Sequence, residues 1–203
     1  MSTRVLQHTP SFDELLNDGV RKVLFLDFDG VVNPLAGTFE IGQKKYYRPN
    51  HLIYCDSPWG GEERYIVKWS TEMIEHLSSL VSTPDSVLIW LTAWKQNVIV
   101  PVSKMGFAAS REQLWLDFDK GVSKYPKQAL KREAMSDFLG DTALPIGVKV
   151  AWVDDEVLTG SHSADFTTKF GPGALPVRTN TKYGLSRWDI SCMKRFFNST
   201  EGD

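Results

Sequence analysis

Two acidic side chains stand directly after an apolar segment near the start of the chain. Asp27 and Asp29 follow the run 22–26 and are themselves followed by Gly30. Because successive side chains of a strand point to opposite faces, the two carboxylates converge only if the backbone leaves strand geometry, and Gly30 permits such a turn. Two hard oxygen ligands at the end of a strand suit Mg²⁺. The alternative is a loop whose acids merely face water.

Two later apolar segments end in side chains that complement this pair. The run 87–91 ends in Thr92, whose hydroxyl is suited, with the next backbone N–H groups, to hold a phosphoryl oxygen. The run 148–153 ends in Asp154 and Asp155. Adjacent acids after a buried strand repel each other unless a metal ion or a lysine neutralises them.

Lysines that can supply this positive charge lie between the segments 87–91 and 148–153. Lys124 precedes Pro126 in a loop, and Lys127 begins an amphipathic helix predicted over 127–139. A solvated helix face is the alternative interpretation for the basic residues of this region, Lys120, Lys127, Lys131 and Arg132.

The elements that must position these residues alternate along the chain. Apolar or alternating runs predict strands at 22–26, 87–91, 113–118, 148–153 and about 175–178. Helices are predicted to begin after Ser11, Ser70 and Ser186, and a helix is predicted over 127–139. This alternation implies right-handed βαβ units in an α/β fold, a Rossmann-like, doubly wound parallel sheet of about five strands. Sites in such sheets lie beyond the carboxyl ends of the strands.

Three stretches do not follow this rhythm. Residues 95–107 are ambiguous because Pro101 interrupts them, and a polar, Gly-rich loop is expected after 148–153. The stretch 35–69, rich in Tyr, Gly, Pro and Trp, is interpreted as a short β-rich flap or cap inserted over the site. We therefore expect one domain over residues 1–203.

Composition narrows the classes of function. The 23 basic and 25 acidic side chains give a net charge of −2, which provides no global field for nucleic acid or an anionic membrane. The two cysteines support neither a disulfide scaffold nor a zinc site. No apolar run approaches the roughly 20 residues of a membrane helix, and no signal peptide is evident. We expect a cytoplasmic protein without membrane contact, and no obligate protein partner is evident.

The order of these motifs resembles the haloacid dehalogenase (HAD) superfamily of phosphohydrolases. The resemblance covers about residues 22–195 and rests on DFDGV, an apolar strand ending in Thr92, a lysine, and WVDDE. The segments DFDGVVNP, WLTAW, AWVDDE and the late Thr179 with Gly184-Leu185-Ser186 are similar to the small HAD domains associated with RNA-repair proteins.

This resemblance implies a set of catalytic roles. Asp27 would attack phosphorus and form an aspartyl-phosphate, and Asp29 would act as general acid and then general base. Thr92 would bind the transferring phosphoryl group. The lysine is assigned to Lys124, which precedes a proline as in many members, in preference to Lys127.

The resemblance also implies ligands for Mg²⁺ and for the substrate. The metal ligands would be Asp27, Asp29 and, at the family's usual acidic pair, Asp155, with Asp154 a further ligand or an indirect contact. The substrate-binding candidates are Thr92, Ala93, Trp94 and Lys127.

Other tryptophans and a second acidic motif are interpreted separately. Trp59 is a further candidate for the pocket wall, whereas Trp90 and Trp152 lie within predicted strands and are assigned to the core. Asp117-Phe118-Asp119 repeats the letters of the first motif without a following glycine, so it is interpreted as a strand end with surface acids.

The sequence thus predicts a Mg²⁺-dependent phosphomonoester hydrolase whose partner is a phosphorylated substrate. By analogy, the substrate is a nucleic-acid end or a nucleotide. One alternative is a small-metabolite phosphatase of the same mechanism, and another is a catalytically silent binding or scaffold domain. A glycosyltransferase-type D-x-D motif is a third alternative, but it explains neither Thr92 nor the Asp154-Asp155 pair.

Overall fold

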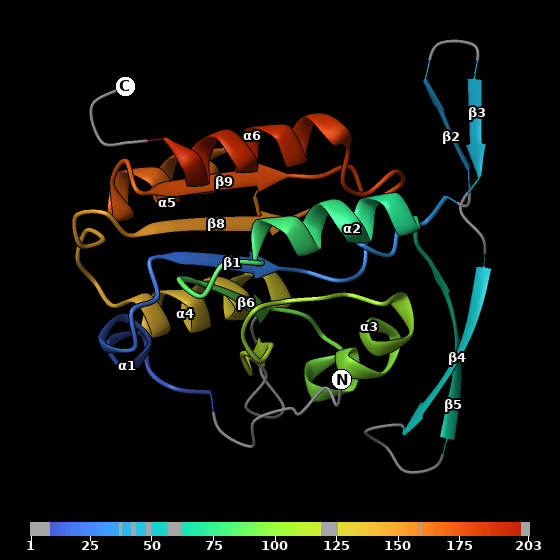
Figure 1. The fold of residues 1–203 in the computed structure, drawn as a ribbon, viewed down its shortest axis with the longest axis horizontal. Coiled ribbons are helices and arrows are strands. Elements are labelled where there is room, and N and C mark those ends of the chain that lie inside the picture. Colours follow the sequence, from blue (N-terminus) through green and yellow to red (C-terminus); the bar gives the residue numbers. More distant parts are fainter. Residues whose placement is uncertain are drawn as a thin grey trace.

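A parallel β-sheet lies at the centre of the molecule (Figure 1). The computed structural model describes residues 9–36, 38–41, 44–47, 50–56, 62–118, 126–158 and 160–199. Within these residues the sheet has five strands, in the spatial order β7 (Leu114–Trp115), β6 (Ser86–Trp90), β1 (Lys22–Leu26), β8 (Lys149–Asp154) and β9 (Ala174–Arg178). The predicted α/β class and doubly wound parallel sheet are confirmed.

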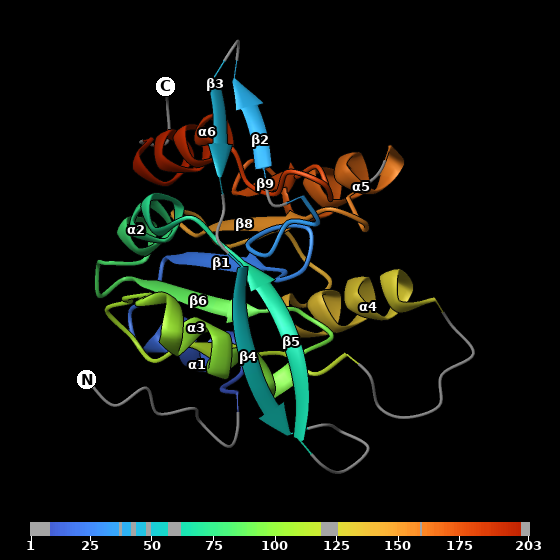
Figure 2. The ribbon, with the colours of Figure 1, turned by 90° about the vertical axis from the view of Figure 1, so that its right-hand side faces the viewer.

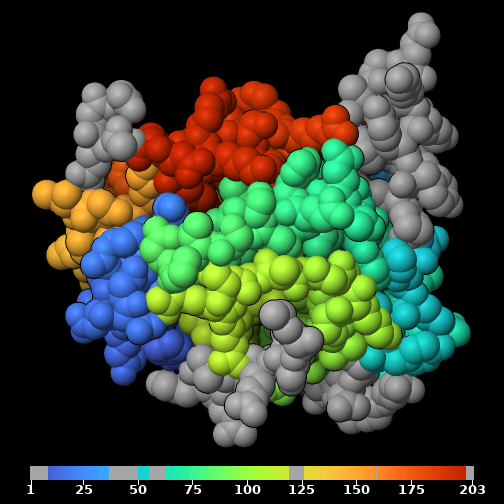
Figure 3. Space-filling model, viewed as in Figure 1, coloured from blue at the N-terminus to red at the C-terminus, as the bar shows by residue number. Residues whose placement is uncertain are grey.

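Both faces of this sheet are buried because its strands carry apolar side chains on each side. Leu24 and Leu26 belong to one core, which is covered by α2 (Thr71–Leu80), α3 (Ile99–Met105) and α6 (Arg187–Asn198). Val23 and Phe25 belong to the other core, which is covered by α1 (Phe12–Asn17), α4 (Lys127–Leu139) and α5 (Ser161–Phe170). The space-filling view shows α6, α2 and α3 side by side over the first face (Figure 3). Two helical layers therefore hold the strands rigidly from both sides.

The helix ends follow the local sequence signals in most places. Ser11 and Ser186, after which helices are predicted to begin, each accept a hydrogen bond from a backbone N–H three residues on and form capping boxes. Helix α4 begins directly after Pro126, as predicted. Ser70 precedes α2 as predicted, but its side chain makes no capping hydrogen bond.

Two predictions about the less regular stretches need completion or correction. The ambiguous stretch 95–107 contains a short 3₁₀ helix, η1 (Lys95–Val98), and then α3. Pro101 is tolerated because it lies in the first turn of α3, where its missing N–H removes little. The polar loop expected after β8 is wrong in part, since α5 follows there. Its Phe166 and Phe170 are four residues apart and both buried, so they form the apolar stripe of a helix.

The predicted β-rich insertion consists of antiparallel strand pairs outside the main sheet. Strands β2 (Thr38–Ile41) and β3 (Lys44–Tyr47) form one pair, and β4 (Asn50–Asp56) and β5 (Glu62–Lys68) form the other. Figures 1 and 2 place β4 and β5 at the end of the molecule toward which the strands of the main sheet point. Ile53 and Val67, on the inner face of this pair, join the core.

The strand order creates a switch point at the middle of the sheet. From β1 the chain adds β6 and β7 on one side and then returns to add β8 and β9 on the other. At such a point the connections leave β1 and β8 in opposite directions, so ligands bind beyond the carboxyl ends of these strands. Those ends carry the acids that the sequence singled out.

In the part of the chain that the structure describes, the helices are all too short or too polar to cross a membrane.

Candidate functional site

Asp27 stands at the carboxyl end of the central strand, at the position that the sequence predicted. Its backbone N–H donates to Val153 O at 3.0 Å, which continues the pairing of β1 with β8 by one residue. Its carboxyl Oδ1 accepts a hydrogen bond from the N–H of Phe28 at 2.7 Å. The residue is 6% exposed. The sheet thus fixes the backbone of Asp27 and presents its carboxylate at a buried edge.

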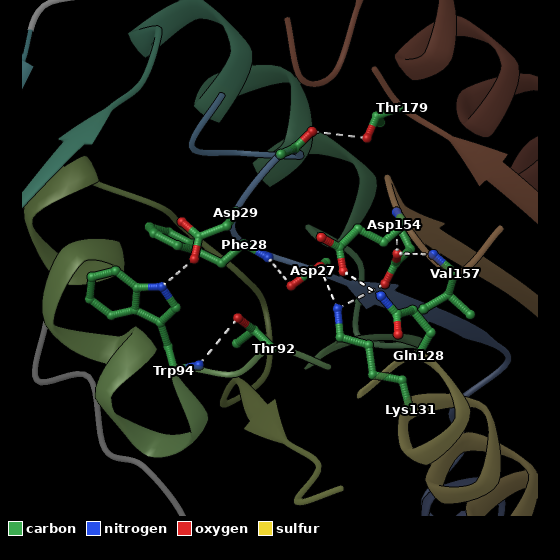
Figure 4. A network of polar contacts seen from close by, with 12 residues as sticks. Asp27, Phe28, Asp29, Thr92, Trp94, Gln128, Lys131, Asp154, Val157 and Thr179 are labelled. Carbon is green, nitrogen blue, oxygen red and sulfur yellow. Dashed lines mark hydrogen bonds and ion pairs between the residues drawn. The ribbon is translucent and has the colours of Figure 1, made fainter. Parts of the chain in front are cut away.

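A lysine from α4 lies between two of the acids (Figure 4). The Lys131 ammonium donates to Asp27 Oδ2 and, at 3.0 Å, to Asp154 Oδ2. Lys131 is 5% exposed. The interpretation of Lys131 as part of a solvated helix face is therefore wrong: it lies on the inner stripe of α4.

Of the two lysines that the sequence offered for this role, the structure describes only Lys127. Lys127 is exposed in the first turn of α4, and Lys124 lies outside the described residues. Among the described lysines of this region, the one that contacts the acids is Lys131, one helical turn beyond Lys127. The assignment to Lys124 stays a prediction.

Asp154 and Asp155 differ in what they contact. Asp154 is fully buried, and its Oδ1 accepts hydrogen bonds from the N–H groups of Glu156 at 2.8 Å and Val157 at 2.7 Å. Because its Oδ2 accepts from Lys131, both oxygens are engaged by the protein. For Asp155, the neighbouring Thr181 side chain lowers the pKa of the carboxyl, in opposition to burial. Asp155 is therefore the acid of the pair with more acceptor capacity left for a ligand.

Burial dominates the electrostatics of these groups. It raises the pKa of the Asp27 carboxyl to about 7, even though the neighbouring Lys131 ammonium acts in the opposite direction. Burial also raises the pKa of Asp155 above its ordinary value. Burial alone would lower the pKa of Lys131, but the carboxylates of Asp27 and Asp154 outweigh it and the pKa is raised. The lysine is therefore a cation at any physiological pH.

The three acids form a cluster suited to a divalent cation. Asp27, Asp154 and Asp155 are all buried, and each offers an oxygen within 4.8 Å of the others. Three carboxylates beside the one ammonium of Lys131 leave excess negative charge when all are ionised. Carboxylate oxygens are hard ligands, so the donor set and the charge both fit Mg²⁺.

The Gly30 turn brings Asp155 close to the first motif. Gly30 has φ +71°, and a Cβ on it would lie 2.0 Å from Asp155 Oδ2. The Thr179 hydroxyl, at the end of β9, donates to Gly30 O at 3.0 Å. The predicted turn after Asp29 is confirmed, and only a residue without a side chain leaves room for the Asp155 carboxylate.

Asp29 lies outside the cluster of three acids and points away from it, toward Trp94 (Figure 4). Its Oδ2 accepts from the Trp94 indole N–H at 2.8 Å, and its Oδ1 accepts from the Asn33 amide at 2.6 Å. Asp29 is exposed, in contrast to Asp27. Its place among the metal ligands stays a prediction.

Thr92 follows β6, as predicted, and is 1% exposed. Its hydroxyl accepts from the backbone N–H of Trp94 at 3.4 Å, and Figure 4 shows it between Trp94 and Asp27. Ala93, the next candidate, is exposed. The end of β6 therefore contributes a buried hydroxyl at the same edge of the sheet as Asp27.

The remaining predictions have mixed outcomes. Trp90 and Trp152 are core residues, 2% and 1% exposed, as predicted. Asp117 is a surface acid that pairs with Lys95 at 3.4 Å, whereas Asp119 and Trp59 lie outside the described residues.

The sequence reasoning missed Lys131 and Asn33. A signal for Lys131 was present, because Lys131, Met135 and Leu139 recur at intervals of four residues and all are buried. A lysine on the apolar stripe of a helix needs a buried partner, and the unpaired acids supplied one. For Asn33, no interval from other residues indicated its contact with Asp29.

We expect the replacement Lys131→Met to destabilise the metal-free protein by about 3–5 kcal/mol, because it leaves two buried carboxylates without their cation. Urea unfolding in EDTA measures this loss. Lys127→Met, which removes an exposed lysine from the same helix, is the control and should change stability by less than about 0.5 kcal/mol. Equal effects of the two replacements would contradict the contacts described for Lys131.

The raised pKa of Asp27 predicts a pH dependence of stability. Because the folded state holds the proton of Asp27 more tightly than the unfolded state, its contribution is complete below about pH 4 and is lost as the pH rises to about 7. In EDTA, the melting temperature of the wild type should therefore fall more steeply between pH 5 and pH 8 than that of Asp27→Asn. Parallel profiles for the two proteins would contradict this assignment.

No curated protein matches the chain. Residues 23–190 match the model of a protein family, the HAD domain in Swiss Army Knife RNA repair proteins. The matched region contains β1, β6, β8 and the acids at their ends, together with α4 and its Lys131. The chain therefore belongs to the family of HAD domains in Swiss Army Knife RNA repair proteins.

Proposed function

We propose that the protein is a Mg²⁺-dependent phosphomonoester hydrolase that works through an aspartyl-phosphate on Asp27. The observation that carries the proposal is the buried Asp27 carboxylate, which contacts Lys131 and lies in one cluster with Asp154 and Asp155. Family membership supports phosphohydrolase chemistry at the level of the superfamily. A silent scaffold has no physical need for a cluster of buried acids in which the pKa of Asp27 is raised to about 7.

The proposed first step transfers the phosphoryl group to the protein. A carboxylate oxygen of Asp27 attacks phosphorus, the bond from phosphorus to the ester oxygen breaks, and Asp29 gives its proton to that oxygen. The Lys131 ammonium fixes the orientation of the Asp27 carboxylate, and the Thr92 hydroxyl donates to a phosphoryl oxygen. When bound by Asp27, Asp155 and Asp154, Mg²⁺ would offset the charge of the phosphate oxygens.

The proposed second step returns the protein to its initial state. Asp29, now a carboxylate, takes a proton from water as the water oxygen attacks phosphorus. The bond between phosphorus and the Asp27 oxygen breaks, and inorganic phosphate leaves. The exposed position of Asp29 suits this role, because the water must reach it from solvent.

We infer that the substrate is the phosphorylated end of a nucleic acid or a nucleotide. The support is the family, whose description refers to RNA repair proteins. The insertion adds basic residues, of which Arg64 has a described side chain that is exposed. Phosphate contacts of this kind hold a polymer without reading its bases. A small-metabolite phosphatase of the same mechanism is the second candidate, and release of phosphate from oligonucleotides, nucleotides and sugar phosphates compares the two.

We expect Asp27→Asn to abolish the hydrolysis of p-nitrophenyl phosphate, because the amide cannot act as the nucleophile. The wild type should need Mg²⁺ and lose activity in EDTA. Asp117→Asn, which alters the surface copy of the same Asp-Phe-Asp motif, is the control and should retain wild-type turnover. Turnover in Asp27→Asn close to that of the wild type would refute the aspartyl-phosphate.

We expect Gly30→Ala to weaken Mg²⁺ activation by about tenfold or more, because its new Cβ displaces the Asp155 carboxylate. The activity measured against the Mg²⁺ concentration gives this shift. Gly106→Ala is the control: Gly106 has a similar φ of +73°, but nothing lies within 4 Å of a Cβ there. Both replacements strain the backbone, so an equal effect on Mg²⁺ activation would exclude a role of Asp155 in metal binding.

A further inference from the structure

The exposed carboxylate of Asp29 is held on both sides by neutral donors. The Trp94 indole N–H donates to Oδ2 and the Asn33 amide donates to Oδ1. An exposed aspartate without such partners moves among several staggered rotamers. Two donors from separate segments, one on each oxygen, restrict Asp29 to one orientation.

The two donors are themselves fixed. The Asn33 carbonyl oxygen accepts from the N–H of Lys68 at 2.9 Å, so its amide nitrogen must face Asp29. The Trp94 ring packs against two other aromatic rings, with centroids 5.1 Å from that of Phe28 and 4.7 Å from that of Tyr65. Phe28 belongs to the Asp27-Phe28-Asp29 motif and Tyr65 to β5. The indole N–H is therefore aimed at Asp29 by packing as well as by its own hydrogen bond.

We propose that Trp94 is a positioning residue, which aims Asp29 at the ester oxygen of the substrate; this role rests on the proposed function. Each carboxyl oxygen has two acceptor positions, so the hydrogen bonds from Trp94 and Asn33 leave positions at which the catalytic proton can sit. Proton transfer requires donor and acceptor to meet within hydrogen-bond distance and in line. Trp94 acts through Asp29 and need not touch the substrate.

How much a correctly positioned proton donor accelerates cleavage depends on the basicity of the leaving group. A p-nitrophenolate ion leaves readily without a proton, whereas an alkoxide is a strong base and leaves as the alcohol. Loss of the indole N–H should therefore slow the cleavage of an alkyl phosphate more than that of p-nitrophenyl phosphate. A loss of packing alone would slow both to the same extent.

The test compares kcat/KM for p-nitrophenyl phosphate and glycerol phosphate in Mg²⁺. kcat/KM reports the steps up to release of the leaving group, so later hydrolysis of the aspartyl-phosphate does not affect it. We expect Trp94→Phe, which keeps a ring, to lower the ratio of the alkyl to the aryl value by about tenfold or more. In an Asp29→Asn background the same replacement should leave the ratio unchanged, because the group that Trp94 positions is gone.

Trp90→Phe is the matched control. It removes an indole N–H from the same segment, but that group donates to Gln113 at 2.8 Å and not to Asp29. It should lower stability without altering the ratio. Should Trp94→Phe fold poorly, Tyr65→Leu removes the ring that packs on Trp94 and should shift the ratio in the same direction by a smaller factor.

The outcomes separate this role from the proposed function. Mg²⁺-dependent turnover that Asp27→Asn abolishes, with an unchanged ratio in Trp94→Phe and in Tyr65→Leu, would overturn the role of Trp94 alone. Failure of the wild type to hydrolyse either ester in Mg²⁺ would overturn the proposed function and this role with it.

Discussion

The buried ammonium of Lys131 between Asp27 and Asp154 is the interaction on which the site depends. Carboxylates that meet at the ends of neighbouring strands repel each other, and burial removes the water that would screen them. The ammonium meets both carboxylates, so it holds β1, β8 and α4 in one arrangement. Within the described residues, one ammonium contacts three clustered acids, so negative charge remains when all of them are ionised. This remaining charge suits the cluster to a divalent cation.

This charge arrangement is possible because of the topology. Asp27, Thr92 and Asp154 each come at or just after the end of a parallel strand, so they meet at one edge of the sheet, at its switch point. That part of the site was predictable, because buried strands and the polar residues after them are both visible in the sequence. The turn at Gly30 was predictable for a different reason: glycine adopts a positive φ without strain.

The contacts made by side chains over long distances were harder to predict. Lys131 is separated from Asp27 by 104 residues, and a lysine in an amphipathic helix usually faces water. Its interval of four residues from Met135 indicates the inner face of α4, whereas its charge is typical of the outer face. The hydrogen bonds of Asp29 depend on where β5 packs, which no local pattern specifies. Helix α5 was missed because its polar residues hid the pair of buried phenylalanines.

The two acids of the first motif illustrate how environment assigns chemistry. Asp27 is buried beside an ammonium and two other carboxyls, so its interactions are with charges. Asp29, two residues on, is exposed and is held by an indole and an amide, which carry no charge. A nucleophile is best held in one orientation and shielded from water. A group that exchanges protons with a leaving group and with water must remain accessible to solvent. The backbone turn that separates them therefore places two identical side chains in different environments, which suit the two roles proposed for them.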